Sequence, residues 1–148
     1  MIVQVTQVAF HFNVADRLAY ACRLLRKAVA SGTKVLVTGL PETLHQLDSV
    51  LWTFSATDFV AHCDVTSEAQ MVAASSVVFA PTVGFAPDFP VLLNLGPAVP
   101  EGLEQFERVI ELVTLDNEDR QLARSRWKGY ADRGYAITRH DLALKTAY

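Results

Sequence analysis

IVQVTQVAFHFNVADRLAYACRLLRKAVASGTKVLVTGLPETLHQLDSVL, residues 2–51, is the stretch that decides the fold. Residues 2–12 alternate polar and apolar side chains and end in VAFHF, a pattern that predicts a strand. Behind Asp16, a good helix-capping residue, apolar side chains recur at helical spacing as far as Val29, and Gly32 ends that helix. A β-branched strand follows at 34–38, and Pro41 opens a second helix. This strand–helix–strand–helix order predicts parallel strands joined by right-handed crossovers.

Further along, the pattern is less regular but still alternates. Residues 76–80 (SVVFA), 91–95 (VLLNL) and 108–113 (RVIELV) are candidate strands, the third of them the last strand of the sheet. A short helical piece is expected near 101–107, and a polar helix over 117–133 is closed by Gly134. We expect one α/β domain over residues 1–148, with a mostly parallel sheet flanked by helices.

Composition bounds the class of protein. Apolar residues make up 51% of the chain and charged residues 20%, which excludes a disordered or fibrous protein. The longest apolar runs, such as 35–37 and 90–93, are too short to span a membrane. The N-terminus resembles a strand and not a signal peptide, so we expect a cytoplasmic protein that is not in the membrane. Cys22 and Cys63 are therefore expected to be free thiols.

The sequence offers no recognisable catalytic, cofactor or metal motif. The first strand-to-helix turn, FNVADRL, lacks the glycines that let backbone amides approach a pyrophosphate, and the second, VTGLPET, has one glycine and a proline. His62-Cys63-Asp64 is the one cluster of possible metal ligands, but three consecutive residues cannot all point at one ion. We therefore interpret these as loop residues and expect no nucleotide, metal or catalytic site. A small enzyme without a recognisable motif stays open as an alternative.

Charge is unevenly distributed. Residues 1–116 hold 6 Lys/Arg and 12 Asp/Glu, a balance of −6, while residues 117–148 hold 7 and 4, a balance of +3. A basic end on an acidic body indicates a local site for an anionic partner. It argues against binding to duplex DNA, which needs a broader basic field.

The helix expected at 117–133 gathers this charge on one face. At about 100° per residue, Arg120, Arg124, Trp127 and Lys128 fall within about 100° of arc. Ala123, Tyr130 and Gly134 lie on the adjoining face, which we expect to pack against the sheet, and Trp127 lies on the border between the two faces. An aromatic ring beside fixed cations suits a peptide with an acidic run and a terminal apolar residue. The alternative is an ordinary solvated face with a tryptophan packed at its border.

The segment LARSRWKGYADRGY (122–135), preceded by FERVIELV and LLNL, resembles the C-terminal region of the chi subunit of bacterial DNA polymerase III holoenzyme. LDSVLWTFSATDFVAH (47–62) is similar to that family's middle motif, and the N-terminal elements lie in the same order. The resemblance spans nearly the whole chain. It implies a Rossmann-like fold without bound nucleotide, and a non-catalytic clamp-loader accessory subunit.

The resemblance also implies two partners. Chi subunits bind the psi subunit of the clamp loader and the acidic C-terminal tail of single-stranded DNA-binding protein, which ends in an apolar residue with a free carboxylate. Carried over by motif, Trp52 and Phe59 would face psi. The tail site would comprise Val113, Arg120, Arg124, Trp127 and Lys128: Arg124 takes the terminal carboxylate, Val113 and Trp127 line the apolar pocket, and Arg120 and Lys128 meet the acidic run. Direct binding of single-stranded nucleic acid by the basic helix is the competing hypothesis.

Overall fold

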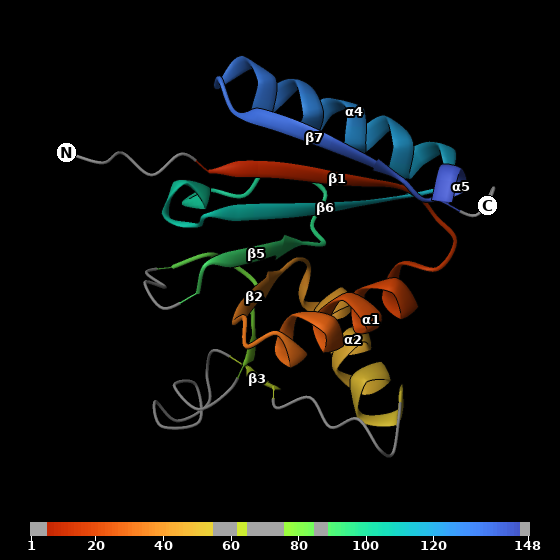
Figure 1. The fold of residues 1–148 in the computed structure, drawn as a ribbon, viewed down its shortest axis with the longest axis vertical. Coiled ribbons are helices and arrows are strands. Elements are labelled where there is room, and N and C mark those ends of the chain that lie inside the picture. Colours follow the sequence, from red (N-terminus) through yellow and green to blue (C-terminus); the bar gives the residue numbers. More distant parts are fainter. Residues whose placement is uncertain (1–5, 55–61, 65–75, 85–88, 146–148) are drawn as a thin grey trace.

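The fold is built on one parallel sheet of seven strands, as a computed structural model of the chain shows (Figure 1). The structure describes residues 6–54, 62–64, 76–84 and 89–145. The strands are β1 Gln7–Val14, β2 Val35–Thr38, β3 His62–Asp64, β4 Val77–Ala80, β5 Val91–Asn94, β6 Arg108–Thr114 and β7 Ala136–Asp141. They are ordered β3-β4-β2-β5-β6-β1-β7, and each pair of neighbours runs parallel. The predicted α/β class is confirmed.

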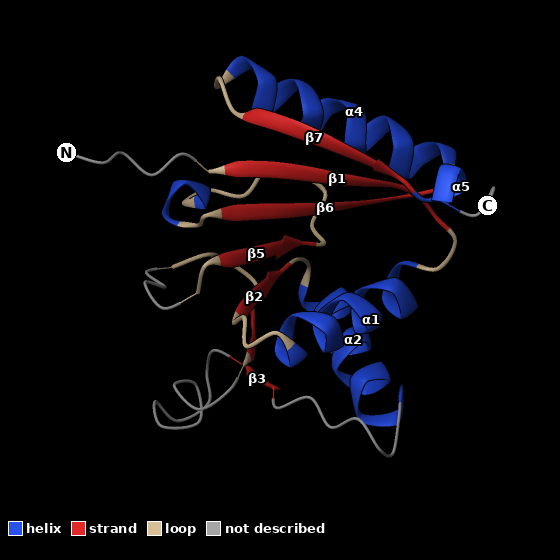
Figure 2. Ribbon diagram, viewed as in Figure 1, coloured by secondary structure: helices blue, strands red, loops and turns tan. Residues whose placement is uncertain are grey.

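Helices cover both faces of the sheet (Figure 2). They are α1 Arg17–Ala30, α2 Pro41–Phe54, the 3₁₀ helix η1 Leu103–Gln105, α4 Asn117–Asp132 and the one-turn α5 Leu142–Lys145. Residues of α1 and α2 such as Cys22, Leu25 and Leu47 form one buried cluster with the sheet. On the opposite face Tyr130 of α4 packs with Phe10 of β1 in a second cluster. The sheet is therefore covered on two sides, as parallel sheets require.

The helix ends follow the chemistry that the sequence predicted. The Asp16 side chain caps α1 by accepting a hydrogen bond from the Ala19 amide at 3.1 Å. Asp116 caps α4 in the same way through the Asp119 amide at 3.0 Å. Gly134 follows α4 with a φ of +84°, a left-handed conformation that glycine adopts without strain. The cap on α4 fixes where its first basic residue lies relative to the end of β6.

Four expectations differ from the structure. His62–Asp64 forms β3 instead of a loop, because its backbone pairs with β4. The helical piece expected over 101–107 is only the 3₁₀ turn Leu103–Gln105. The strand at 108–113 is not the last, because the chain continues after α4 into β7, which pairs with β1. Gly134 ends α4 and is exposed, so it does not pack against the sheet.

The sheet order places the C-terminal elements beside the N-terminal strand. β1 lies between β6 and β7, with His11 in register with Leu112 on one side and with His140 on the other. The carboxyl ends of these three parallel strands therefore meet at one edge, next to the first turns of α4 (Figure 1). Within the described ranges, the chain contains no helix long and apolar enough to cross a membrane.

Candidate functional site: a basic pocket beside α4

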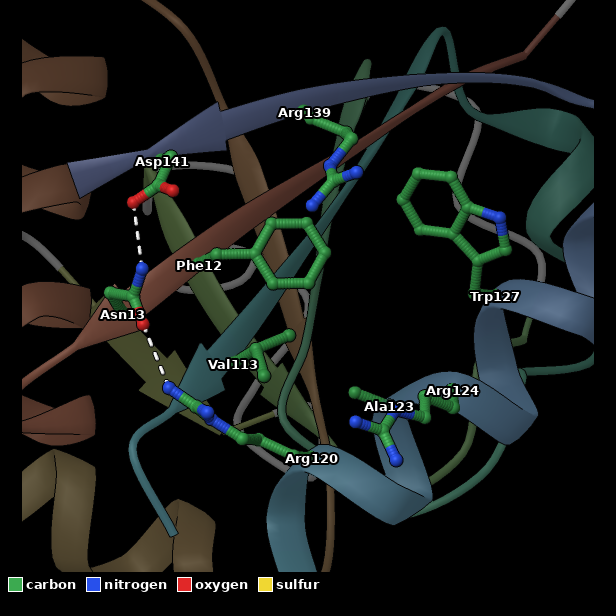
Figure 3. A pocket seen from close by; sticks show the side chains of 9 residues that line it. All are labelled: Phe12, Asn13, Val113, Arg120, Ala123, Arg124, Trp127, Arg139 and Asp141. Carbon is green, nitrogen blue, oxygen red and sulfur yellow. Dashed lines mark hydrogen bonds between the residues drawn. The ribbon is translucent and has the colours of Figure 1, made fainter. Parts of the chain in front are cut away.

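A pocket of about 450 Å³ lies between α4 and strands β1, β6 and β7 (Figure 3). Its volume falls in the range of roughly 300–1,000 Å³ that is usual for ligand clefts. The lining residues come from all four elements: Phe12, Asn13, Val113, Arg120, Ala123, Arg124, Trp127, Arg139 and Asp141. Segments that are far apart in the sequence thus build one site.

The apolar part of the pocket is an aromatic group over a buried aliphatic floor. The Trp127 ring lies 5.0 Å from the Phe10 ring and 6.1 Å from the Phe12 ring, measured between centroids. Val113, at the end of β6, is buried beneath them. Trp127 is half-buried, which places it at the border between the packed and the solvent-facing sides of α4, as predicted. This wall offers contact area for an apolar side chain.

Arg120 is held in place by the backbone and by β1. Its guanidinium donates to the Asn13 side-chain oxygen at 2.9 Å and to the Thr114 carbonyl at 3.4 Å. Asn13 in turn donates to the Asp141 carboxylate at 2.7 Å, so three elements are joined in one chain of hydrogen bonds (Figure 3). Asn13 has a φ of +62°, a conformation that asparagine tolerates better than most residues. The orientation of Arg120 is therefore fixed before any ligand binds.

Arg124 and Arg139 are the exposed cations of the pocket. The Arg124 side chain makes no hydrogen bond or ion pair with any residue that the structure describes. The Arg139 guanidinium lies over the Phe12 ring, 5.0 Å from its centroid, and 5.8 Å from the centroid of Trp127. Both contacts fall within the distance at which cations are attracted to aromatic faces. The pocket thus presents two solvent-accessible guanidinium groups beside an apolar wall.

Asp119 fastens the first turn of α4 to the end of β6. Its carboxylate accepts hydrogen bonds from the Thr114 amide at 2.8 Å and hydroxyl at 2.9 Å, and it forms an ion pair with Arg17 at the start of α1. Burial opposes ionisation of this carboxyl, but the Thr114 hydrogen bonds and Arg17 outweigh it and lower the pKa of Asp119. The carboxylate is thus a fixed negative charge that positions α4.

A second, fully buried polar network lies between α4 and the sheet. The Glu111 carboxylate accepts hydrogen bonds from Arg126 Nε at 2.9 Å, from the Tyr130 hydroxyl at 2.5 Å and from Asn94 Nδ2 at 2.8 Å. Burial raises the pKa of Glu111, while Arg126 and the hydrogen bonds act in the opposite direction. Burial and the Glu111 charge also raise the pKa of Tyr130. The network locks the rotation of α4 about its axis, and with it the basic face.

The structure brings four of the five residues predicted for the tail site into one pocket. Val113, Arg120, Arg124 and Trp127 line it, while Lys128 is exposed and is not among its lining residues. Helical spacing alone placed Lys128 on the same arc, but the pocket lies between α4 and the sheet, and Lys128 lies at the end of that arc that is farther from the sheet. Of the residues predicted to face psi, Phe59 and the side chain of Trp52 lie outside the described residues.

Sequence reasoning missed the pocket residues from β1 and β7. Phe12 and Asn13 stand at the end of a predicted strand, so their position at the carboxyl edge of the sheet was a usable signal. Arg139 and Asp141 belong to β7, whose polar sequence AITRHD gave little indication of a strand.

In the part of the chain that the structure describes, no group of three or more His, Cys, Asp or Glu side chains could hold a metal ion. Cys22 is a free thiol, buried in α1, and its burial raises its pKa to about 11. A thiol with so high a pKa is protonated at neutral pH and is a poor nucleophile or metal ligand. Cys22 therefore acts as a small apolar residue of the core.

Comparison with known proteins identifies the family. The family model described as "DNA polymerase III chi subunit, HolC" matches residues 5–138. The chain belongs to the DNA polymerase III chi subunit family. A curated relative, DNA polymerase III subunit chi of Pseudomonas aeruginosa, is 33% identical over 127 residues, which cover 85% of this chain and 87% of the relative. The matched range includes β1 through β6, all of α4 and the first half of β7, so it contains the pocket residues of β1, β6 and α4 but not Arg139 and Asp141.

A solved structure is similar in fold only. The C-terminal domain of the DEAD-box protein Dbp5 superposes with a TM-score of 0.59, over 95% of this chain and 92% of that one, at 14% sequence identity. At that identity the likeness supports the α/β architecture and carries no function. Membership of the chi family places the chain in DNA replication, as an accessory subunit of the polymerase III complex.

Proposed function

We propose that this chi-family chain is a non-catalytic adaptor that links the clamp loader, through psi, to the acidic C-terminal tail of single-stranded DNA-binding protein. One observation carries the proposal: two accessible guanidinium groups, Arg124 and Arg139, flank an apolar wall in a pocket open to solvent. A peptide that ends in an apolar residue with a free carboxylate needs both features at once. Its carboxylate pairs with a guanidinium, and its last side chain is buried against a ring.

The geometry supports the role proposed for each residue. Arg124 is exposed and lacks a described internal partner, so its guanidinium is available to the terminal carboxylate. Trp127 and Val113 receive the apolar side chain. Arg120 is committed to Asn13 and Thr114, and it contributes a fixed positive field for the acidic run. Lys128, which is outside the pocket lining, meets only residues of the tail that lie further from its terminus.

The test is calorimetric titration with a synthetic peptide of several aspartates that ends in Pro-Phe with a free carboxylate. Arg124→Ala should weaken binding by on the order of 1–3 kcal/mol, the scale of a charge-assisted partner at an interface. Amidation of the peptide's C-terminus should weaken its binding to the wild-type chain by a similar amount. The same amidation should weaken binding to Arg124→Ala only slightly, because that variant already lacks the guanidinium that pairs with the carboxylate. Arg133→Ala, which removes an exposed charge outside the pocket, is the matched control. Equal affinity of Arg124→Ala and the wild type would refute the assigned site.

The psi half of the proposal rests on Trp52 and Phe59, by resemblance to the middle motif of the family. Alanine at both positions should abolish co-purification with psi and leave binding of the acidic peptide unchanged. Arg124→Ala should do the reverse. Tight binding of the isolated chain to single-stranded DNA would favour the competing nucleic-acid hypothesis instead.

A further inference from the structure

A second groove lies on the other face of the sheet, opposite α4. It has a volume of about 740 Å³ and runs between α1 and strands β1, β6 and β7. α4 covers these strands on one face (Figure 1), where Val8 and Phe10 are fully buried. On the groove face, Thr138 of β7 and Gln7 of β1 are exposed. Among the described helices, α1, α2 and the one-turn α5 pack on this face, but only α1 lines the groove, so part of the sheet face lacks the helical layer that covers its other side.

The rim of this groove is basic. Three of its lining residues are Arg23 and Lys27, one turn apart on α1, and Arg108 at the start of β6. None of the three side chains has a hydrogen bond or ion pair with a described residue. Among the described residues, no aspartate or glutamate lines the groove. Residues 1–116 are acidic overall, with 6 Lys/Arg and 12 Asp/Glu. Three of those six basic residues nevertheless line this one groove. Such a cluster selects for a negatively charged partner.

The floor of the groove is aliphatic and shallow. Ala9 and Ile110 from the strands and Leu24 and Ala28 from α1 form it, and the exposed Thr138 continues it toward the edge strand. The aliphatic floor suits the apolar stripe of an amphipathic helix. The opposite face of the same strands already binds a helix, α4, through such a stripe.

We propose that this α1–β1–β7 groove is a docking site for an acidic amphipathic helix of a partner protein, separate from the tail pocket. The helix lays its apolar stripe on the half-buried Leu24 and Ala28, above the buried Ala9 and Ile110, and its carboxylates meet Arg23 and Lys27. Single-stranded nucleic acid fits less well, because it needs free aromatic faces for its bases. The rings of this groove are engaged with one another: the Tyr20 hydroxyl is 2.5 Å from His11 Nδ1, and the His11 and His140 rings lie 4.8 Å apart.

The experiment uses the full chain and a labelled 15-residue helical peptide. Its leucines recur at spacings of three and four, and glutamates flank them; a control peptide has glutamine in place of each glutamate. Fluorescence anisotropy should show peptide binding that weakens at high salt, because salt screens charge pairs. The control peptide should bind at least about tenfold more weakly, because it lacks the carboxylates that complement the basic rim. Arg23→Glu with Lys27→Glu should cause a similar loss, whereas Arg124→Ala and Arg133→Ala should leave binding unchanged.

Three outcomes would overturn the proposal. The first is an absence of salt-sensitive peptide binding, or binding that survives the double charge reversal. The second is a loss of peptide binding in Arg124→Ala, which would assign the peptide to the tail pocket. The third involves a thymidine oligonucleotide as the alternative ligand. If the oligonucleotide binds in place of the peptide, and Arg23→Glu with Lys27→Glu weakens that binding, the groove is a nucleic-acid site. Circular dichroism of each variant confirms folding, since the two α1 positions are exposed.

Discussion

Arg126 of α4 and Glu111 of β6 form an ion pair inside the protein, with Nε 2.9 Å from Oε1 and with 3% and 0% of the two residues exposed. A charged residue of a surface helix is thus turned inward, where it determines how α4 sits on the sheet. The pair gains further hydrogen bonds from Tyr130 and Asn94, which complete the partners of the carboxylate. The exposed basic face of α4 is oriented by this buried contact.

Arg126→Leu should lower the free energy of unfolding by about 3–5 kcal/mol, because it leaves the Glu111 carboxylate buried without its cation. Arg126→Leu combined with Glu111→Leu should be more stable than Arg126→Leu alone, since the double variant buries no charge. Tyr130→Phe, which removes one hydrogen bond, should cost less, about 1–2 kcal/mol. Urea unfolding measures all three. A double variant no more stable than the single would show that packing, and not charge, is responsible.

Asp119→Asn should destabilise the protein at neutral pH by about 1–3 kcal/mol, the value of hydrogen bonds to a charged group. The folded-state pKa of Asp119 is lowered, so its stabilisation is present above its unfolded pKa of about 3.9 and is lost as pH falls through the folded value. The wild type and the variant should therefore converge in stability in strong acid. Denaturant unfolding across the acidic range measures this, with Glu118→Gln, at an exposed neighbour, as control. A stability gap that is constant with pH would contradict the assignment.

Much of this architecture was predictable, because it depends on local signals. The Asp16 cap, the apolar stripe of α1 and the β-branched β2 are set by neighbours in the sequence, and each was found where predicted. The pocket residues of α4 were predictable for the same reason: helical geometry places Arg120, Arg124 and Trp127 on one side.

The features that escaped prediction depend on contacts between distant segments. β7 is an edge strand of polar composition, and it is a strand because β1 supplies its hydrogen bonds. From the sequence, Arg126 is expected to be exposed, because it lies in a polar helix. It is buried because Glu111, on β6, lies beneath it and forms an ion pair with it. Lys128 was placed by angle around the helix, and that angle does not say how far the sheet extends under α4.

Asn13→Ala should be less stable than Asn13→Gly by about 1 kcal/mol, because alanine at a φ of +62° brings its Cβ close to the following carbonyl oxygen. Both variants lose the hydrogen bonds to Arg120 and Asp141. Both should therefore bind the acidic peptide more weakly than the wild type, and by the same factor, if Asn13 acts by orienting Arg120. Urea unfolding and calorimetry separate the two effects. If Asn13→Gly bound the peptide like the wild type and only the less stable Asn13→Ala bound it more weakly, Asn13 would have a structural role alone.

Arg139→Ala should weaken binding of the acidic peptide by about 0.5–2 kcal/mol, through loss of a rim charge and of the cation–π contacts that hold the Phe12 and Trp127 rings. Arg139→Lys should recover part of this loss, because it restores the charge without the planar group that lies over the two rings. Since β7 is an edge strand and Arg139 is exposed, neither change should affect the free energy of unfolding by more than about 0.5 kcal/mol. Calorimetry on both variants, with Arg133→Ala as the matched control, decides the matter: if Arg139→Ala binds as tightly as Arg133→Ala, then the tail is recognised by α4 alone.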